Sequence, residues 1–343
     1  SQVDIDSELD GYVQKRASNL YLPDQIIYML PPNLSSLCSL GESEKSSALS
    51  VGFKMIECQI SDIKILQSEI KVVKMSYEEA DKALKEDKVL SKLNNLTKSH
   101  KAFRNNNGAI KLDLPNVDVK IKNKKVDIQI QTESESRELV AEMMVIAGRV
   151  IAQYANEHEI SMPFLTQEVG SFSEDIIQNK ENLTAAQAFQ ATRCFKQSKI
   201  TPKASLHAGL GLSCYVRVTS PIRRYLDLLT QQQLVRFINN QTTLDDVQIK
   251  QRITQVNAVI SRVNKATRQS IEHFKCLFLK QKPQWSGKGI IVDLNGNKAT
   301  LLIPEIAMIT QLKLKSKAQL EDEIELRAVS INLENRSIDF KPL

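Results

Sequence analysis

Apolar and polar residues follow two different rhythms along this chain, and the change of rhythm divides it near residue 283. Before that point, apolar positions that recur every three to four residues predict helices over 7–17, 136–158, 183–195 and 245–281. Two stretches alternate residue by residue, 50–75 and 117–132, and predict hairpins that turn at Ser61-Asp62 and at Asn123. The larger part of the chain therefore combines helices with strands.

The end of the chain has the pattern of a small all-β unit. Strand-like runs follow one another at 289–293, 299–303, 310–314, 323–330 and 337–341. Asn295-Gly296 between the first two is a strong hairpin turn, and five short strands suggest a partly open OB barrel. We predict the α+β class, with a mixed sheet and surrounding helices over 1–283 and an OB barrel over 286–343.

Composition narrows the class of protein. Of the 343 residues, 42% are hydrophobic and 25% charged, which is typical of a globular chain. The apolar stretch 139–151 is broken by Glu142 and Arg149, so we expect no membrane span and no membrane partner. The five cysteines are scattered without C-x-x-C spacing, which disfavours a zinc knuckle and indicates buried thiols in a reducing, cytoplasmic compartment.

Charge is unevenly distributed along the chain. The net charge is +6, yet the stretch 64–125 alone holds 15 Lys and Arg against 8 Asp and Glu. We call this stretch the lysine belt. It is a candidate footprint for a phosphate backbone, and on charge alone a solvated lysine face explains it better.

The segment 219–227 contains candidate residues for a phosphate-binding site. Ser220 and Pro221 have the residue types of an N-cap and a first helical position, so we expect a helix from there to residue 238. Arg223 would then lie in the first turn, where amide groups and a guanidinium form a receptor for a phosphodiester. The alternative is an ion pair between Arg223 and Asp227 on a surface helix, and the spacing alone favours that alternative.

These residues also resemble a known family. Residues 219–227 are similar to the T-S-P-I-R-R-Y-x-D signature of the ribonuclease II (RNB) family of exoribonucleases, and His207-Ala-Gly-Leu-Gly-Leu followed by Tyr215 is similar to its H-x-G-L-G-L…Y run. Further matches in the family's order are Ser7, Leu9, Asp10, Arg16, Ser18, Tyr21-Leu22-Pro23 and the stretch 137–144. The resemblance covers about residues 6–283, and the family usually carries an RNA-binding OB domain where this chain has its predicted barrel.

The resemblance implies an activity. Members of the family degrade single-stranded RNA processively from the 3′ end to nucleoside 5′-monophosphates, with Mg²⁺ held by a cluster of aspartates. Arg223 matches the catalytic arginine that contacts the scissile phosphate, and Tyr21 matches a tyrosine that stacks near the last nucleotide. Without the motif, a core tyrosine would be the better interpretation of Tyr21. The other RNA-binding residues that the resemblance implies are Ser220, Arg224, Tyr225 and His207. We expect a monomer.

The chain also departs from the family pattern. The family's D-x-D-D metal cluster lies some tens of residues before the Y-L-P segment, and only twenty residues precede Tyr21 here. Asp4, Asp6 and Asp10 could form that cluster, but Asp10 fits the later S-x-L-D block and Asp6 is too close to Tyr21. We therefore expect the metal ligands to lie upstream of Ser1, in a longer protein that binds Mg²⁺, and this fragment alone to be inactive.

Two other functions stay open. The chain could be a catalytically inactive family member that only binds RNA. It could also be a scaffold subunit whose lysine belt meets an acidic protein partner. The channel is a further point of departure, because Gln231-Gln232 stands where many members have His-Arg.

Overall fold

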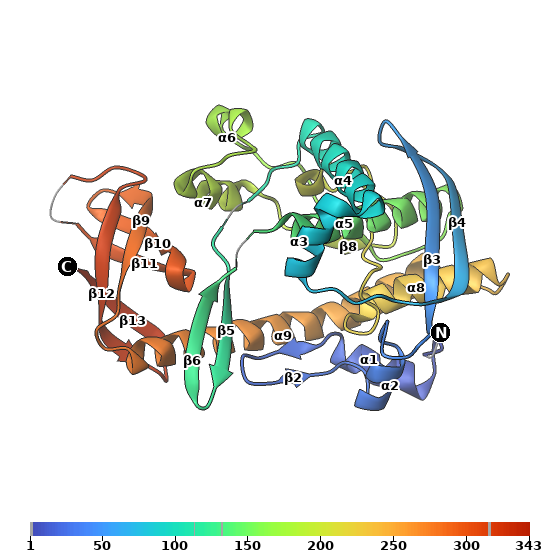
Figure 1. Cartoon of the computed structure of the whole chain (residues 1–343), viewed down its shortest axis with the longest axis horizontal. Helices are drawn as coiled ribbons and strands as arrows, with labels where there is room; N and C mark the ends of the chain where they lie inside the picture. The colour runs from blue at the N-terminus through green and yellow to red at the C-terminus, as the bar shows by residue number, and fades with distance from the viewer. Residues whose placement is uncertain (1–2, 113, 132, 315–316) are drawn as a thin grey trace.

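The computed structural model describes residues 3–112, 114–131, 133–314 and 317–343. Helices and hairpins form a larger body, the C-terminal strands form a barrel, and one long helix, α9, runs from the body to the barrel (Figure 1). The helices of the described residues are α1 Glu8–Arg16, α2 Pro32–Leu37, α3 Tyr77–Glu86, α4 Lys88–Asn106, α5 Glu135–Glu157, α6 Glu174–Gln178, α7 Ala185–Cys194, α8 Tyr225–Ile238 and α9 Asp246–Gln281.

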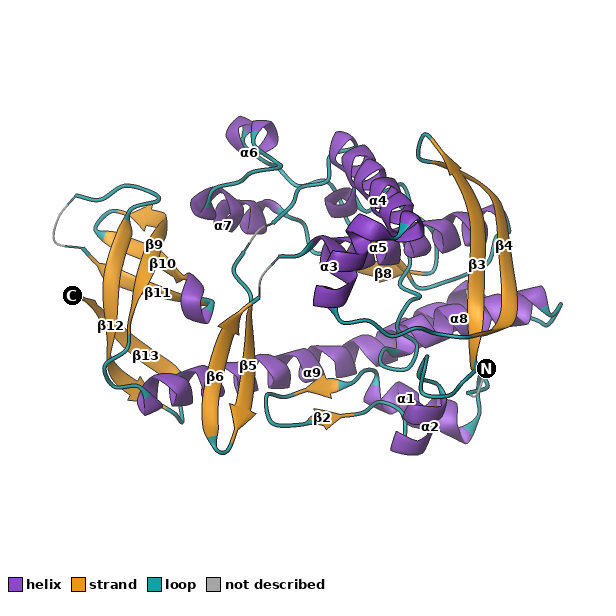
Figure 2. Ribbon diagram, in the orientation of Figure 1, coloured by secondary structure: helices purple, strands orange, loops and turns teal. Residues whose placement is uncertain are grey.

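The strands of the body pair only in twos among the described residues. Each pair is antiparallel: β1 Leu20–Tyr21 with β2 Ile26–Ile27, β3 Ser46–Ile56 with β4 Gln59–Ile70, β5 Val117–Lys122 with β6 Lys125–Ile130, and β7 Phe164–Thr166 with β8 Lys199–Thr201. The α+β class is confirmed. The expected mixed sheet is replaced by these separate pairs, of which Figure 2 shows β3–β4 and β5–β6 most clearly.

The C-terminal barrel confirms the five predicted strands. They are β9 Ser286–Asn295, β10 Lys298–Ile303, β11 Met308–Lys313, β12 Glu323–Asn332 and β13 Ser337–Pro342. Their order is β11-β10-β9-β12-β13, every pair is antiparallel, and the two edge strands approach each other so that the barrel is nearly closed. Gly296 has φ +61° in the turn between β9 and β10, as a tight hairpin requires.

Side-chain caps begin the predicted helices. Ser7 accepts a hydrogen bond from the amide of Asp10 at the start of α1, and Asp245 and Gln248 form a capping box at the start of α9. Helix α5 begins one residue earlier than expected, because Ser134 caps it. The helical periodicity of these segments therefore predicts the right elements.

The first hairpin turns at a different place from the one predicted. The turn between β3 and β4 is formed by Glu57 and Cys58, which both have positive φ, of 47° and 62°. Asp62, at φ 51°, lies inside β4, where the register shifts opposite Gly52 and Lys54. The polar Ser61-Asp62 pair thus lies next to a β-bulge. Small polar residues are common both in bulges and in turns, so the sequence does not distinguish the two.

The barrel shares its hydrophobic core with the body. Its buried side chains pack together with Phe278 and Leu279 of α9 and with Val126 of β6. Two reciprocal hydrogen bonds fix the same contact, from the Val126 amide to Gln281 Oε1 and from Gln281 Nε2 to the Lys124 carbonyl, each 3.0 Å long. The β5–β6 hairpin is therefore attached to both α9 and the barrel. No helix within the described residues is long and apolar enough to cross a membrane.

Candidate functional site

The segment 219–227 is a turn followed by a helix, which corrects the predicted helix start. Helix α8 begins at Tyr225, four residues after the expected first position, and Arg224 is its N-cap residue with extended backbone. Residues 221–223 form a turn in which the amide groups of Arg223 and Arg224 donate to the Ser220 carbonyl. Arg223 thus lies in this turn and not in a helical first turn, so the expected phosphate receptor at a helix N-terminus is not formed by it.

Asp227 holds this turn together from the first turn of α8. Its Oδ2 accepts from the Ser220 amide at 2.9 Å and from Arg224 Nη2 at 2.8 Å. The predicted alternative, an ion pair of Asp227 with Arg223, is wrong, because Arg224 takes that place. Asp227 is fully buried, and its Oδ1 and the Nε of Arg224 have no hydrogen-bond partner among the described residues. Such atoms are rare in folded proteins and are often found at functional sites.

The same turn is docked on the chain that follows α1. The Asn19 amide donates to the Arg223 carbonyl at 3.0 Å, the Tyr225 amide donates to the Ala17 carbonyl at 2.8 Å, and Ser18 forms an antiparallel bridge with Arg224. These backbone bonds place the Arg223 turn beside the segment that leads into β1. The Arg223 guanidinium is half-buried, and none of the described residues forms a hydrogen bond or an ion pair with it.

Tyr21 lies on this docked segment and is not a core residue. It is 42% exposed, and its hydroxyl accepts from Asn19 Nδ2 at 3.3 Å. Asn19 is itself fixed, because its Oδ1 accepts from the Met29 amide at 2.7 Å. Asn19 therefore connects the exposed ring of Tyr21 with the backbone of Arg223, and an exposed aromatic ring of this kind offers a face for a base.

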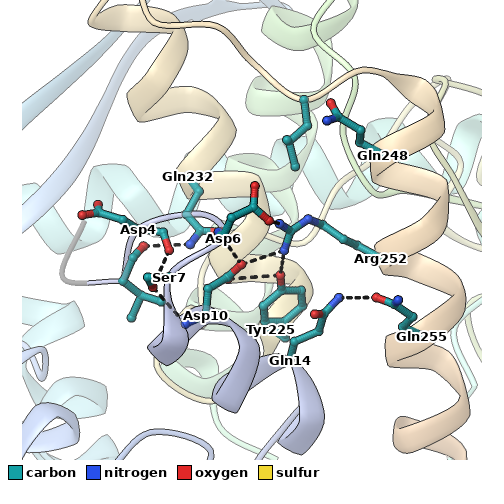
Figure 3. A network of polar contacts seen from close by, with 12 residues as sticks. Asp4, Asp6, Ser7, Asp10, Gln14, Tyr225, Gln232, Gln248, Arg252 and Gln255 are labelled. Atoms are coloured by element: carbon teal, nitrogen blue, oxygen red, sulfur yellow. Dashed lines mark hydrogen bonds and ion pairs between the residues drawn. The ribbon is translucent and has the colours of Figure 1, made fainter.

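A polar network around Asp10, Tyr225 and Arg252 lies next to the site and holds α1, α8 and α9 in place (Figure 3). Asp10 accepts from the Tyr225 hydroxyl at 3.2 Å through Oδ1 and from Arg252 Nη1 at 2.7 Å through Oδ2. Arg252 also contacts the Tyr225 hydroxyl and the Asp6 carboxylate. Burial raises the pKa of Tyr225, and the nearby Asp10 carboxylate raises it further, so this hydroxyl stays protonated. The network ties α1, α8 and α9 together.

The described acidic residues do not fit a divalent metal ion. Asp10 and Asp6 both form ion pairs with Arg252, whose positive charge already balances theirs, and the second oxygen of Asp10 accepts from the Tyr225 hydroxyl. No group of three His, Cys, Asp or Glu that could hold a metal is found in the part of the chain that the structure describes. A magnesium site of the kind that the family resemblance implies is therefore not provided by these residues.

His207 fixes the glycine-rich loop. Its Nδ1 accepts from the Leu210 amide at 3.3 Å, its amide donates to the Leu212 carbonyl at 2.8 Å, and its ring packs edge-on against Tyr215. Burial lowers the pKa of His207, and the nearby Arg217 lowers it further. Gln167 clamps the other side of the loop, because its Oε1 accepts from the Gly209 amide at 3.0 Å.

A buried ion pair joins this loop to the helices behind it. Arg104 of α4 binds both carboxylate oxygens of Glu142 on α5, and its Nη1 donates to the Leu210 carbonyl at 3.2 Å. His100 contacts the same carboxylate. Gly211, at φ +63°, lies so close to the Arg104 carbonyl that a Cβ there would be 2.4 Å from it. Close backbone approach explains why glycine stands at this position.

The predicted site residues thus divide by exposure. Tyr21 and Arg223 keep accessible side-chain surface, whereas Ser220, Tyr225 and His207 are buried. These three side chains have little surface for a nucleotide, and the RNA contact expected of them stays a prediction. Arg224 is partly exposed, but its guanidinium is engaged by Asp227.

Several neighbours of the site carry no signal in the sequence. They are Asn19, Arg104, Gln167 and Arg252, and most of their partners lie far away in the chain. Glu138 and Glu142, one helical turn apart beside Arg149, suggest a solvated ion-pair network. Glu138 does form an exposed ion pair with Lys101, but Glu142 is buried between α4 and α5. Gln231 and Gln232 donate to the carbonyls of Val218 and Val3, so both brace backbone rather than line a surface.

The lysine belt is not one continuous surface. Figure 1 shows β4 at one end of the body and the β5–β6 hairpin next to the barrel, so the belt is spread over the molecule. Within the described residues, six of its fifteen basic side chains form ion pairs: Lys71 with Glu44, Lys74 with Glu42, Lys98 with Glu135, Lys101 with Glu138, Arg104 with Glu142 and Lys111 with Glu133. The remaining basic residues lie mainly on α3, α4 and the β5–β6 hairpin.

Comparison with known proteins agrees with this architecture. Residues 1–240 match the RNB domain, and the chain belongs to this family. An uncharacterized ribonuclease of Synechocystis sp. is 29% identical over 298 residues, which are 83% of this chain and 44% of that protein. The chain spans about half the length, or less, of the curated relatives it matches.

Two solved structures show the same fold. The RNase R of Mycoplasma genitalium, in complex with ribose-methylated single-stranded RNA, matches all of this chain and 65% of its own with a TM-score of 0.85 at 18% identity. The yeast pseudonuclease Ssd1 matches 91% of this chain and 44% of its own with a TM-score of 0.74 at 16% identity. The fold therefore occurs in a nuclease and in a protein named as a pseudonuclease.

Proposed function

We propose that residues 1–343 form the substrate-binding part of a 3′-to-5′ exoribonuclease that hydrolyses single-stranded RNA processively to nucleoside 5′-monophosphates. The observation that carries the proposal is the pair of Arg223 and Tyr21 in an RNB family chain. Backbone bonds fix the two residues on adjoining segments, the Arg223 guanidinium forms no ion pair with a described residue, and the Tyr21 ring is exposed. RNA bound to a relative of the same fold supports the substrate class.

Each side chain has a role that its chemistry allows. The Arg223 guanidinium would bind the scissile phosphate and stabilise the negative charge that builds in the transition state. The Tyr21 ring would stack on a terminal base. Ser220, Arg224, Tyr225 and His207 would act through their neighbours, because they hold the turn and the glycine-rich loop in place.

The Mg²⁺ that the family resemblance implies would need ligands from outside residues 1–343. The Arg252 contacts of Asp6 and Asp10 support this part of the proposal, and so does the greater length of the relatives. We therefore propose that residues 1–343 alone bind RNA without hydrolysing it. The complete protein would hydrolyse it.

The substrate part of the proposal is tested by binding. A labelled oligouridine is titrated with residues 1–343 in the absence of divalent metal ions, with a duplex of equal length as the comparison. We expect tighter binding of the single strand, and about five-fold or greater weakening by Tyr21→Ala, since base stacking on an aromatic ring is worth ~1–3 kcal/mol. Equal binding of duplex and single strand, unchanged by Tyr21→Ala, would contradict it.

A second candidate function is RNA binding without catalysis in any form of the protein. The engagement of Asp6 and Asp10 by Arg252 favours this candidate, and the fold match with a pseudonuclease is compatible with it. The complete protein decides between the two. Release of nucleoside monophosphates in Mg²⁺ supports the enzyme, and binding without release supports the RNA-binding member.

A further inference from the structure

We propose that the tip of the β5–β6 hairpin and the end of α9 form a docking patch for the sugar-phosphate backbone of single-stranded RNA, outside the Arg223 site. The patch consists of Lys122, Lys124, Lys125, Lys280 and Lys282, and we call it the junction patch. The inference rests on the proposed function, since it assigns a second contact to the same substrate.

The hairpin tip is built in a way that lowers its own stability. Lys122 lies directly opposite Lys125 in the β5–β6 register, and like charges in opposite positions destabilise a sheet. Lys124 has φ +64° in the turn, where glycine is the favoured residue after Asn123. Lysines therefore stand at the tip although neither the register nor the turn geometry favours them there.

The charges of the tip are not neutralised within the described structure. One cross-strand pair of the hairpin, Lys120 opposite Asp127, is charge-balanced, but the three lysines beyond it are exposed and form no ion pair with a described residue. They differ in this from Lys71, Lys74 and Lys98 of the same lysine belt, which are paired with glutamates. The uncompensated part of the belt therefore includes this tip.

The tip is held rigidly against the end of α9. Gln281 exchanges two hydrogen bonds with the backbone of Lys124 and Val126, and Val126 is buried in the core shared with the barrel. This contact fixes the hairpin tip beside the end of α9, where the exposed residues Lys280 and Lys282 flank Gln281 and the Lys282 ammonium lies 4.2 Å from the centre of the Phe278 ring. Figure 1 shows the hairpin crossing α9 next to the barrel, with its turn directed away from α7.

The chemistry of the patch fits a phosphate chain better than a protein partner or a membrane. No large hydrophobic side chain is exposed between residues 115 and 129 or between 248 and 308 of the described chain. Protein interfaces need an apolar centre, and surface-bound membrane segments need apolar side chains to insert. Several lysines without exposed apolar neighbours match a flexible polyanion, which they bind by counterion release.

The test compares two triple variants of residues 1–343 that remove the same charge. In the junction variant, Lys122, Lys124 and Lys125 are replaced by Gln. In the control, Lys82, Lys85 and Lys88 are replaced by Gln; these are exposed belt lysines of the α3–α4 region that form no ion pair with a described residue. Binding of labelled oligouridine is measured over a series of salt concentrations, without divalent metal ions.

We expect the junction variant to bind roughly tenfold more weakly at low salt. Its log–log salt slope should become shallower by about 0.7 for each phosphate that the variant no longer neutralises. The control should keep a slope close to that of the unchanged chain, and replacing the junction lysines by Arg should preserve binding. Thermal melting shows that each variant is folded.

Three results would overturn the inference. The junction variant could keep the slope and affinity of the unchanged chain, which leaves the proposed function intact but removes the patch. The control could weaken binding as much as the junction variant, so that only net charge matters. The patch lysines could be needed for binding phosphatidylserine vesicles or an acidic polypeptide and not oligouridine. If the unchanged chain binds no RNA, the proposed function itself fails.

Discussion

The amide of Asn19 donates to the carbonyl of Arg223 at 3.0 Å, and this bond helps to join two distant segments of the body at the candidate site. Asn19 also binds the hydroxyl of Tyr21, so the residue that fixes the arginine turn fixes the exposed tyrosine as well. The geometry thus places Arg223 and Tyr21, which are distant in the chain, on adjoining segments.

Removing the guanidinium of Arg223 should affect turnover and leave folding intact. In the complete protein, Arg223→Ala should lower the rate of RNA hydrolysis by about a hundredfold or more, as removal of one transition-state donor does. RNA affinity should fall much less, and Arg223→Lys should not restore the rate, because an ammonium cannot bind phosphate in two places. Single-turnover kinetics and thermal melting check both expectations. A large drop in melting temperature with Arg223→Ala would show that its role is structural.

Asp10 and Asp6 should differ strongly in their effect on stability. The Asp10 side chain is 2% exposed, and removing it leaves Arg252 buried with one partner fewer, so Asp10→Ala should cost about 3 kcal/mol or more. The Asp6 side chain is 76% exposed, so Asp6→Ala should cost less than about 1 kcal/mol. Urea unfolding of the two variants measures the difference. Equal costs would contradict the assignment of Asp10 to the buried network.

Stability should depend on pH through Glu142. Burial raises the pKa of its carboxyl, but the hydrogen bonds and charges of His100 and Arg104 outweigh burial and hold the pKa below its ordinary value of 4.5. The unfolded chain then takes up a proton first as the pH falls. The stability that Glu142 contributes is present above pH 4.5 and is lost as the pH falls through the lower, folded-state pKa.

The check is urea unfolding between neutral pH and about pH 3, with Glu142→Gln as the variant. We expect the free energy of unfolding of the unchanged chain to fall more steeply on acidification than that of the variant. Parallel curves would show that the carboxyl is not held by Arg104 and His100 in solution.

The barrel should depend on a residue outside its own strands. Phe278 of α9 is buried in the barrel core, so Phe278→Ala should destabilise the protein by roughly 3–5 kcal/mol. Hydrogen exchange of the amides in β9 and β10 should become faster in the variant. Unchanged exchange in those strands would indicate a barrel that is independent of α9.

Much of the fold was accessible from the sequence, because local signals decide it. The barrel strands, the helices α1 and α9 and the second hairpin follow from alternation, turn residues and helical periodicity. Ser220-Pro221 has equally good local signals for a helix start. The structure forms a turn there instead, because Tyr225 and Arg223 bond to the backbone of Ala17 and Asn19, and Asp227 accepts from the Ser220 amide. Ala17 and Asn19 are distant in the chain, so no local pattern indicates them.

The same limit applies to the site. The resemblance to the family motifs indicated Arg223 and Tyr21 as site residues, but it did not show which motif residues are exposed and which are buried. Tyr225 and His207 match the family as well as Arg223 does, and only the packing shows that they are enclosed. Arg252 carries no motif and is recognised only through its contacts with Asp10 and Tyr225.

The most direct measurement is the release of nucleoside 5′-monophosphates from labelled single-stranded RNA, with Mg²⁺ or Mn²⁺ present, by residues 1–343 and by the complete protein. The account predicts binding without release for residues 1–343, and metal-dependent release from the 3′ end for the complete protein, diminished by Arg223→Ala. Metal-dependent release by residues 1–343 alone would contradict it, and would show that Asp4, Asp6 and Asp10 act as metal ligands, with Asp6 and Asp10 released from Arg252.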